Sequence, residues 1–241
     1  MTMPSLTKKS AWALRLFMVG SVLVAPVTAV WAQSKDADRI RQATTVLNEI
    51  MAAPDRAIPR SVLEQAEGIA VFPSTLKAGL VIGGQRGRGI ISVRDRSHGH
   101  WSIPAFLTLT SGSIGAQIGG QAVDVVLIVM NRRGLENLLQ TQFKIGGEAS
   151  ATAGPVGRDA EASTDIQLRA QILSYSRSRG LFAGISLKGS AVRQDQDSNE
   201  AFYGSRFRTG DIVLDGKATA PHSPTDVAQW RAALDKYVPV K

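Results

Sequence analysis

The clearest hydrophobic periodicity in the chain lies in residues 36–53. Apolar side chains recur there at intervals of three and four residues, with polar residues between them, at Ile40, Ala43, Val46, Leu47, Ile50 and Met51. This spacing predicts an amphipathic helix that ends before Pro54. Its apolar face has two interpretations: a lid over the protein's own core, or a surface that contacts a membrane.

Two short internal helical segments and a C-terminal helix are also predicted. Ser61 and Glu64 have the spacing of a capping box, which predicts a helix that starts at Ser61 and ends near residue 68. Residues 135–142 form a second helical segment. The third follows Pro224 and carries an apolar stripe made of Val227, Trp230, Leu234 and Tyr237.

Between these helices the pattern changes to short apolar or alternating runs that are separated by glycines. The runs predict roughly eight strands, over residues 69–72, 78–82, 89–94, 101–110, 123–130, 143–145, 166–175 and 181–187. We therefore expect an α+β fold with a β-rich core of mainly antiparallel strands, as a sheet or barrel, with an N-terminal amphipathic helix, short internal helices and a C-terminal helix. No repeat or low-complexity linker divides the chain, which predicts one domain over residues 33–241.

Residues 1–32 have the composition of a cleavable signal peptide. Basic residues precede an apolar run that starts at Leu16, and Val30 and Ala32 occupy the minus-three and minus-one positions of a cleavage site. The mature chain is expected to begin at Gln33 and to lie in the periplasm or outside the cell. The apolar run is short for a permanent anchor, and an uncleaved interfacial anchor is the alternative.

The absence of cysteine and the basic charge restrict the partners further. Without cysteine, the chain can carry neither a lipoprotein's lipid-modified cysteine nor a disulfide, so no disulfide-linked partner is expected. The net charge of +8 falls to +5 without residues 1–32, because that segment carries three basic residues and no acidic ones. A moderate basic excess outside the cytoplasm favours anionic lipid headgroups or acidic envelope polymers, and we expect no nucleic-acid partner.

Two glycine-containing segments resemble catalytic or nucleotide-binding loops without their structural context. The cluster from Gly83 to Gly89 is followed by predicted strand, whereas a phosphate loop needs a helix there. These glycines instead indicate a tight hairpin or a close approach of two backbones. The segment from Ser111 to Gly115 also lacks the helix that follows a nucleophile elbow. No acid, base and nucleophile converge, so we expect neither enzymatic activity nor a cofactor.

Two short segments carry residue types that bind metals. His98 and His100 are two residues apart, so both imidazoles face one side of a strand, with Asp95 the nearest carboxylate in sequence. A polar hairpin end is the alternative. Asp195 and Asp197 resemble the start of a calcium loop, but the later glycine and glutamate of that loop are replaced, and an ordered turn is the alternative. The sequence leaves open whether either segment binds a metal.

Many arginines fall in or beside the predicted glycine turns. Arginine at a loop tip can bind phosphate through two parallel hydrogen bonds. Solvated strand ends that keep a basic protein soluble are the alternative. The turn arginines are Arg86, Arg88, Arg94, Arg96, Arg132, Arg133, Arg177 and Arg179.

Several ordered blocks of sequence carry a family resemblance, namely residues 66–73, 77–84, 101–106, 115–121, 124–130, 176–184, 199–204 and 211–214. Together they resemble the SYLF domain, from about residue 47 to residue 216. The resemblance implies a lipid-binding module. Eukaryotic members bind phosphoinositides through a basic surface and an amphipathic N-terminal helix, yeast members also bind actin, and bacterial members are small exported proteins.

The resemblance extends the candidate lipid-binding site to the predicted N-terminal helix. Arg39 and Arg41 occupy the region that the family uses for membrane contact, and Val46, Leu47 and Ile50 form the apolar face that would take acyl chain. We therefore expect a non-enzymatic lipid-binding protein of the bacterial cell envelope, with anionic phospholipid or a membrane surface as its partner. The alternative is a structural or protein-interaction module of the periplasm, with an envelope protein as partner and incidental lipid contact.

Overall fold

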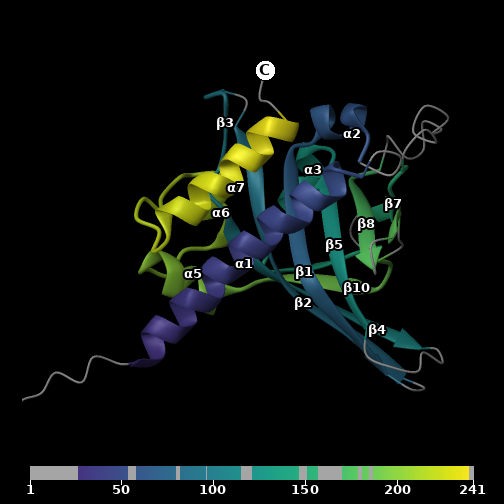
Figure 1. The fold of residues 1–241 in the computed structure, drawn as a ribbon, viewed down its shortest axis with the longest axis horizontal. Helices are drawn as coiled ribbons and strands as arrows, with labels where there is room; N and C mark the ends of the chain where they lie inside the picture. Colours follow the sequence, from purple (N-terminus) through teal and green to yellow (C-terminus); the bar gives the residue numbers. More distant parts are fainter. Residues whose placement is uncertain are drawn as a thin grey trace, which may run out of the picture.

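A computed structural model describes residues 27–53, 58–79, 82–95, 97–114, 121–146, 151–156, 170–178, 181–184 and 187–238. These residues form one curled sheet with helices packed against it (Figure 1). The strands are β1 (Gly68–Gly79), β2 (Ile82–Asp95), β3 (His100–Trp101), β4 (Ala105–Ile114), β5 (Gln121–Val129), β6 (Gln142–Lys144), β7 (Ala151–Ala153), β8 (Ile172–Ser178), β9 (Leu181–Gly184) and β10 (Ser190–Gln194).

The sheet is antiparallel except at one edge. Its strand order is β6-β10-β4-β2-β1-β5-β8-β7, while β3 pairs with β2 and β9 pairs with β8. Only the short β7 lies parallel to its neighbour, β8, among the strands described. The predicted α+β fold with a mainly antiparallel β-rich core is therefore confirmed.

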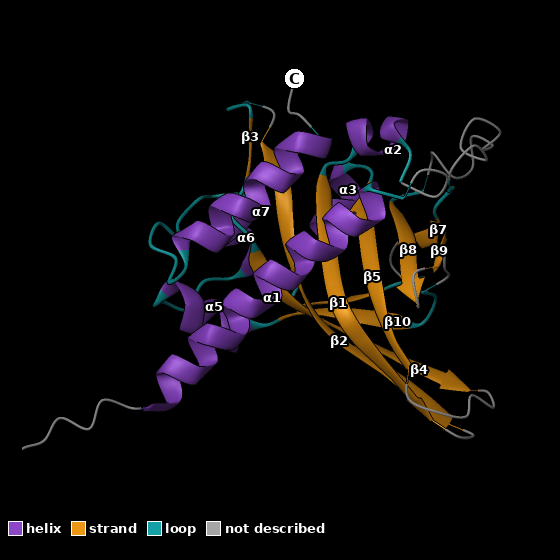
Figure 2. Cartoon of the chain, viewed as in Figure 1, coloured by secondary structure: helices purple, strands orange, loops and turns teal. Residues whose placement is uncertain are grey.

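Six helices accompany the sheet in the described residues: α1 (Val27–Met51), α2 (Arg60–Gln65), α3 (Arg132–Leu138), α5 (Gln196–Tyr203), α6 (Thr209–Val213) and α7 (Pro224–Tyr237). Figure 2 shows α1 and α7 side by side across one face of the sheet. The backbone of α1 begins at Val27, ahead of the predicted cleavage point after Ala32. None of the described helices is both long enough and apolar enough to span a bilayer.

The apolar face of α1 lies in the protein's own core. Ile40, Ala43 and Leu47 have no exposed surface, and they pack between the sheet and α7 because the helix crosses both. The lid interpretation of this helix is therefore confirmed. At roughly 25 cal/mol per Å² of buried apolar surface, each such leucine or isoleucine contributes about 2 kcal/mol to folding.

Two tryptophan hydrogen bonds fix α7 to the sheet. The buried Trp230 donates from Nε1 to the Oγ of Ser92 on β2, at 2.8 Å. Trp101 on β3 donates from its own Nε1 to the carbonyl oxygen of Val238, at 3.1 Å. Since both indoles are fully buried, these bonds satisfy donors that water cannot reach.

The glycine cluster of β2 serves a close approach of two backbones. A Cβ at Gly89 would overlap the carbonyl oxygen of Val71 and the ring of Phe72, and one at Gly87 would overlap the side chain of Thr75. The contacts arise because the register of β1 shifts in this segment, so that its backbone leans on β2. Of the predicted strand over residues 78–82, residues 78 and 79 are the end of β1 and Ile82 begins β2, so these residues belong to two strands; residues 80 and 81 lie outside the described residues.

Three other local predictions differ from the structure. The N-cap of α2 is Pro59, with no side-chain cap, so Ser61 lies inside the helix and the capping-box prediction is wrong. The helix predicted over 135–142 begins earlier, where the side chain of Asn131 accepts a hydrogen bond from the backbone of Gly134 at 2.9 Å. The sequence pattern did not predict β10 or α5. A five-residue strand that runs directly into a short helix is too short to show the two-residue period of a strand or the 3.6-residue period of a helix.

Candidate functional site

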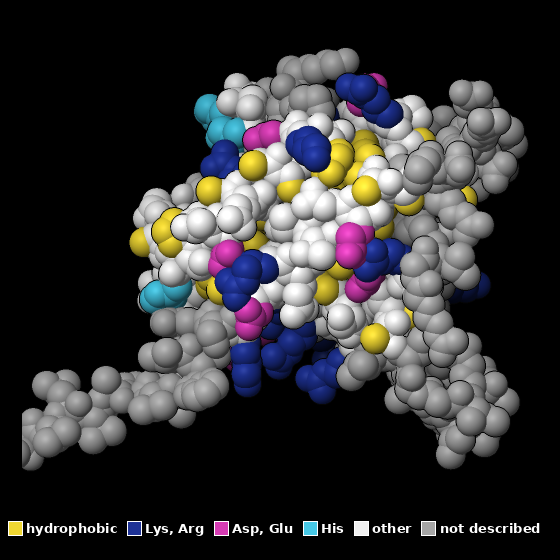
Figure 3. Space-filling view, viewed as in Figure 1, with side chains coloured by type: hydrophobic (Ala, Val, Ile, Leu, Met, Phe, Trp, Pro, Cys, Tyr) yellow, Lys and Arg dark blue, Asp and Glu magenta, His cyan; other side chains and the backbone are white. Residues whose placement is uncertain are grey.

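Four basic side chains gather on one face of three strands, all of them exposed. Figure 3 shows dark-blue side chains along the lower edge of the described surface, beneath α1. We name this surface the basic face; its residues are Arg86 and Arg88 of β2, Arg193 of β10 and Lys144 of β6, together with Thr108 and Thr110 of β4.

Cross-strand register places these residues side by side. One row contains Arg88, Thr108, Arg193 and Gln142, and the next contains Arg86, Thr110, Ala191 and Lys144. Neighbouring strands lie about 4.8 Å apart, so Arg88 and Arg193 are about 10 Å apart at the backbone. Neither row contains an acidic residue, and the alternate residues of the same strands, among them Leu107, Leu109, Val192 and Phe143, are buried on the opposite side.

The arginines of the basic face are largely left unpaired among the described residues, although the positive charge of Arg88 acts on Asp36, where it opposes the rise of the Asp36 pKa. In the part of the chain that the structure describes, no ion pair engages Arg86, Arg88 or Arg193. Unpaired guanidinium groups on a pleated surface leave their donors to solvent or to a ligand, and they create a positive potential over the face. The hydroxyl group of Thr108, half-buried between the cations, can donate to the same anions, whereas that of Thr110 donates to the carbonyl oxygen of Ala191 at 3.4 Å.

Another arginine, Arg39, lies beside the basic face, but its side chain is buried. Its guanidinium is 3.0 Å from Oδ1 of Asp36 and 3.0 Å from Oδ2 of Asp195, donates to Oγ of Ser198 at 3.2 Å, and stacks on the ring of Phe106 at 5.0 Å. Desolvation lowers the pKa of Arg39 and raises the pKa of Asp36, and the attraction between the two opposes both shifts. We call these five residues the Arg39 cluster; it joins α1 to α5 and β4.

The remaining candidate residues of α1 are also engaged inside the protein. Arg41 is half exposed and pairs with Asp38 and, at 2.8 Å, with Asp226 near the start of α7. Val46, Leu47 and Ile50 are at most 4% exposed. In this conformation, none of the three apolar side chains is available to an acyl chain.

Two of the candidate turn arginines hold the fold together. Arg94 is buried, donates to the carbonyl oxygens of Leu63 and Glu64 at 2.9 Å each, and stacks on Trp101. It thereby closes the C-terminal end of α2, where carbonyl groups lack partners within the helix. Arg177 on β8 bridges Asp124, at 3.1 Å, and Glu49 of α1.

The other candidate arginines do not join the basic face. Arg132 and Arg133 are exposed on α3, at the other end of the sheet in Figure 1, and Arg132 pairs with Glu136 at 3.0 Å. Arg96 and Arg179 lie outside the described residues. Of the predicted set, the structure brings together only Arg86 and Arg88, and these lie within β2 and not in a turn.

One pocket among the described residues has a volume of about 660 Å³, and it opens beside β6, β10 and α6. Its lining includes Leu139, Gln194, Arg208 and Asp211. Gln194 is occupied with Leu139 and Thr209, and Arg208 pairs with Asp211 at 3.4 Å. No histidine lines the described pocket, and its two carboxylates, Asp211 and Asp215, are both paired with Lys217.

The two candidate metal-binding segments differ in whether their side chains are already engaged within the fold. Asp195 caps α5 by accepting a hydrogen bond from the backbone of Ser198, at 3.4 Å, and it also binds Arg39. That carboxylate is therefore committed to the fold. Asp95, His98 and His100 form an exposed group at the β2–β3 hairpin, with ligand atoms within 4.8 Å of one another.

Comparison with known proteins gives one matching family model and several curated relatives. Residues 110–237 match the model "Ysc84: Las17-binding protein actin regulator". The chain is 32% identical over 193 residues to Protein YSC84 of Saccharomyces cerevisiae, which covers 79% of this chain and 40% of that protein. It is 33% identical over 175 residues to the human SH3 domain-containing YSC84-like protein 1, which covers 72% of this chain and 50% of that protein.

A second yeast protein, LAS seventeen-binding protein 3, is 33% identical over 193 residues, with coverage of 79% of this chain and 41% of the relative. The chain thus spans about half the length, or less, of these curated relatives. The match to the family model includes β6 and β10 of the basic face and the helices α5, α6 and α7.

Proposed function

Since the chain belongs to the Ysc84 family, whose domain is the SYLF domain, we propose that it is a non-enzymatic binding protein that attaches reversibly to anionic phospholipid of the bacterial cell envelope. The family match confirms the SYLF resemblance of the sequence blocks. The observation that carries the proposal is the basic face, where three arginines that form no ion pair with the described residues lie in register with threonine side chains.

The chemistry of the basic face suits phosphate groups on a surface. Guanidinium groups bind phosphate oxygens through paired N–H donors. Each basic residue near an anionic membrane contributes about 1 kcal/mol, so four contribute roughly 4 kcal/mol. Such attachment is reversible, and salt weakens it because the Debye length at physiological ionic strength is about 8 Å.

The helix α1 contributes to this proposal by its position. Its first turns extend beyond the sheet on the side of the basic face (Figure 2), and Lys35 is exposed there. Its apolar face is the lid of the core, so insertion of Leu47 and its neighbours into a bilayer would require α1 to leave the sheet and break the Arg39 cluster. We therefore assign the contact to the sheet surface and the helix edge.

The composition of residues 1–32 supports a location in the periplasm or outside the cell. Anionic phospholipid headgroups and acidic envelope polymers are the anionic surfaces available to a basic protein there. The relatives in the comparison are yeast and vertebrate proteins, so their own partners do not transfer with the fold.

Vesicle co-sedimentation tests the proposal. We expect the mature protein to bind phosphatidylglycerol vesicles, to bind phosphatidylcholine vesicles weakly, and to be released by high salt. The triple variant Arg86→Gln, Arg88→Gln, Arg193→Gln should lose most of this binding, by roughly a hundredfold at about 1 kcal/mol per arginine.

A matched control removes the same charge elsewhere. The triple variant Arg60→Gln, Arg132→Gln, Arg133→Gln alters exposed arginines on α2 and α3, away from the basic face (Figure 1), and it should keep its affinity. Equal loss in both triple variants, or binding that ignores lipid charge and salt, would contradict the proposal.

Binding to a protein partner is the second candidate function. The description of the matching family names its members as Las17-binding, and one relative is called LAS seventeen-binding protein 3. In this alternative the basic face contacts an acidic envelope protein. Recovery of one stoichiometric partner from an envelope extract, lost in the basic-face triple variant, together with no vesicle binding, would favour it.

A further inference from the structure

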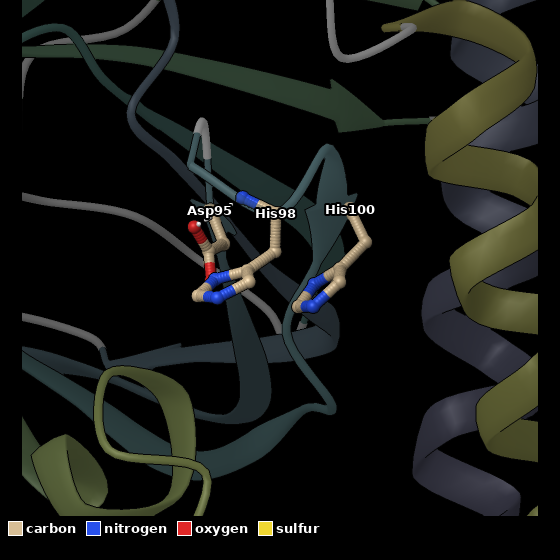
Figure 4. Close-up of side chains that lie close together, drawn as sticks. All are labelled: Asp95, His98 and His100. Carbon is tan, nitrogen blue, oxygen red and sulfur yellow. Dashed lines mark hydrogen bonds and ion pairs between the residues drawn. The ribbon is translucent and has the colours of Figure 1, made fainter.

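The hairpin that joins β2 to β3 carries three side chains with metal-ligand atoms. Asp95 is the last residue of β2 and lies opposite His100, the first residue of β3, in the antiparallel register. His98 is on the turn between them. Figure 4 shows all three side chains on one side of the hairpin, with the carboxylate of Asp95 against the ring of His98.

The local backbone holds this group in place. The Oδ1 of Asp95 accepts hydrogen bonds from the backbone amides of Ser97, at 2.9 Å, and His98, at 3.1 Å. Gly99 has a φ of 68°, a left-handed conformation that glycine adopts without strain. The turn therefore directs His98 and His100 to the same side, where their rings stack with centroids 5.8 Å apart and planes 18° from parallel.

The base of the hairpin is rigid, whereas its end is open to solvent. The next pair of the ladder is Arg94 opposite Trp101; both are buried and stack on each other. In contrast, the side chain of His98 is 71% exposed and that of Asp95 is 33% exposed. A fixed base with accessible ligands lets an ion enter without unfolding the site.

We propose that Asp95, His98 and His100 bind a divalent transition-metal cation of the Zn²⁺ class. Two imidazoles and one carboxylate are a ligand set that such ions favour, and water completes the coordination. The ligand atoms lie within 4.8 Å of one another; in a tetrahedral site they are about 3.4 Å apart. Small rotations of the exposed rings supply that difference.

The hydrogen bonding of Asp95 favours cation binding in two ways. The backbone amide and the hydroxyl of Ser97 donate to Oδ1 of Asp95, at 2.9 and 2.6 Å, and hold the carboxylate beside His98. Its Oδ2 lies 2.6 Å from Nδ1 of His98. A bound ion takes the place of the proton between these two atoms, so that the carboxylate and the imidazole both bind the ion directly and the proton is released.

This site is independent of the lipid proposal. Arg88 and Asp95 are seven residues apart on β2, which is about 24 Å at the usual strand rise, so the metal site and the basic face lie apart. Loss of either function leaves the other intact.

Titration of the mature protein, prepared without a histidine tag, with Zn²⁺ against a chromophoric chelator tests the proposal. We expect one equivalent to bind. His98→Ala with His100→Ala should abolish binding, and Asp95→Asn should weaken it by about tenfold or more. The chain has three histidines, so His222→Ala is the matched control and should bind as the parent protein does.

A spectroscopic readout separates binding from damage to the fold. In an imidazole-detected NMR spectrum, Zn²⁺ should shift the ring resonances of His98 and His100 and leave those of His222 in place. The parent protein binding no Zn²⁺, the double histidine variant binding as tightly as the parent, or shifts confined to His222 would each overturn the proposal.

Discussion

The basic face and the Arg39 cluster lie next to each other but use arginine in opposite ways. Arg39 is 6% exposed and lies between two carboxylates, so its positive charge is paired within the fold. Arg86, Arg88 and Arg193 are exposed in rows without a carboxylate. The difference shows that neighbouring acids and solvent access decide whether an arginine holds a fold together or is free for a ligand.

The largest expected effect comes from removing the buried charge. Arg39→Met leaves Asp36 and Asp195 desolvated without their partner, and loss of one member of a buried ion pair costs about 3–5 kcal/mol. Urea denaturation measures the free energy of unfolding. Arg41→Met, on the same helix but half exposed, should cost at most about 1 kcal/mol. An equal loss of unfolding free energy in the two variants would show that burial of Arg39 between carboxylates does not set it apart from an exposed arginine.

The second-largest effect is expected when a carboxylate is placed beside the arginines of the basic face, as carboxylates lie beside Arg39. Thr108→Glu places a carboxylate between Arg88 and Arg193, in register with both. It should lower the affinity for anionic vesicles by about tenfold, because it adds a negative charge and pairs with an arginine. The free energy of unfolding should change by less than about 1 kcal/mol. Thr108→Gln is the neutral control, and affinity equal to that of the control would count against the face.

A smaller effect is expected for one arginine of the basic face. Arg193→Gln should reduce vesicle affinity about fivefold, which corresponds to roughly 1 kcal/mol, with no measurable change in the free energy of unfolding. Arg133→Gln on α3 is the control for charge removal and should bind vesicles as the parent protein does. If both substitutions reduced binding equally, net charge and not the basic face would explain attachment.

The smallest effect is a pH dependence within the Arg39 cluster. The folded pKa of Asp36 is raised from the usual 3.8, because burial disfavours the carboxylate. The folded state therefore binds the carboxyl proton of Asp36 more tightly than the unfolded state does. The contribution of Asp36 to the free energy of unfolding is greatest below pH 3.8 and falls as the pH rises through the raised pKa. The unfolding free energy of the parent protein minus that of Asp36→Asn should decrease from acidic to neutral pH. A difference that increases with pH would show that the ion pair outweighs desolvation.

The parts of the fold that follow one local period were predictable from the sequence. The helix α1 repeats its apolar positions over several turns, and α7 has proline at its first position with an apolar stripe behind it. Most strands also alternate or are apolar throughout. Their boundaries moved where a long twisted hairpin, β1 with β2, replaced shorter runs.

The basic face was only half predictable, because it depends on pairing between distant segments. Arg86 and Arg88 stood out by their charge, but Arg193 joins them only because β4 lies between β2 and β10. The alternation in β10 was the available signal, and it covers only five residues. Arg94 and Arg177 carried the same local signal as Arg86, yet their partners Leu63, Glu64, Asp124 and Glu49 come from other elements.

The packing of α1 against α7 has a consequence for how the protein is made. The first and last described helices touch each other, and the indole bonds of Trp230 and Trp101 connect the chain's last helical segment to β2 and β3. Until α7 leaves the ribosome, one side of α1 has no neighbour, the Nε1 donor of Trp101 lacks its acceptor and the Oγ of Ser92 lacks its donor. The core of the domain can therefore close only after α7 has been synthesised.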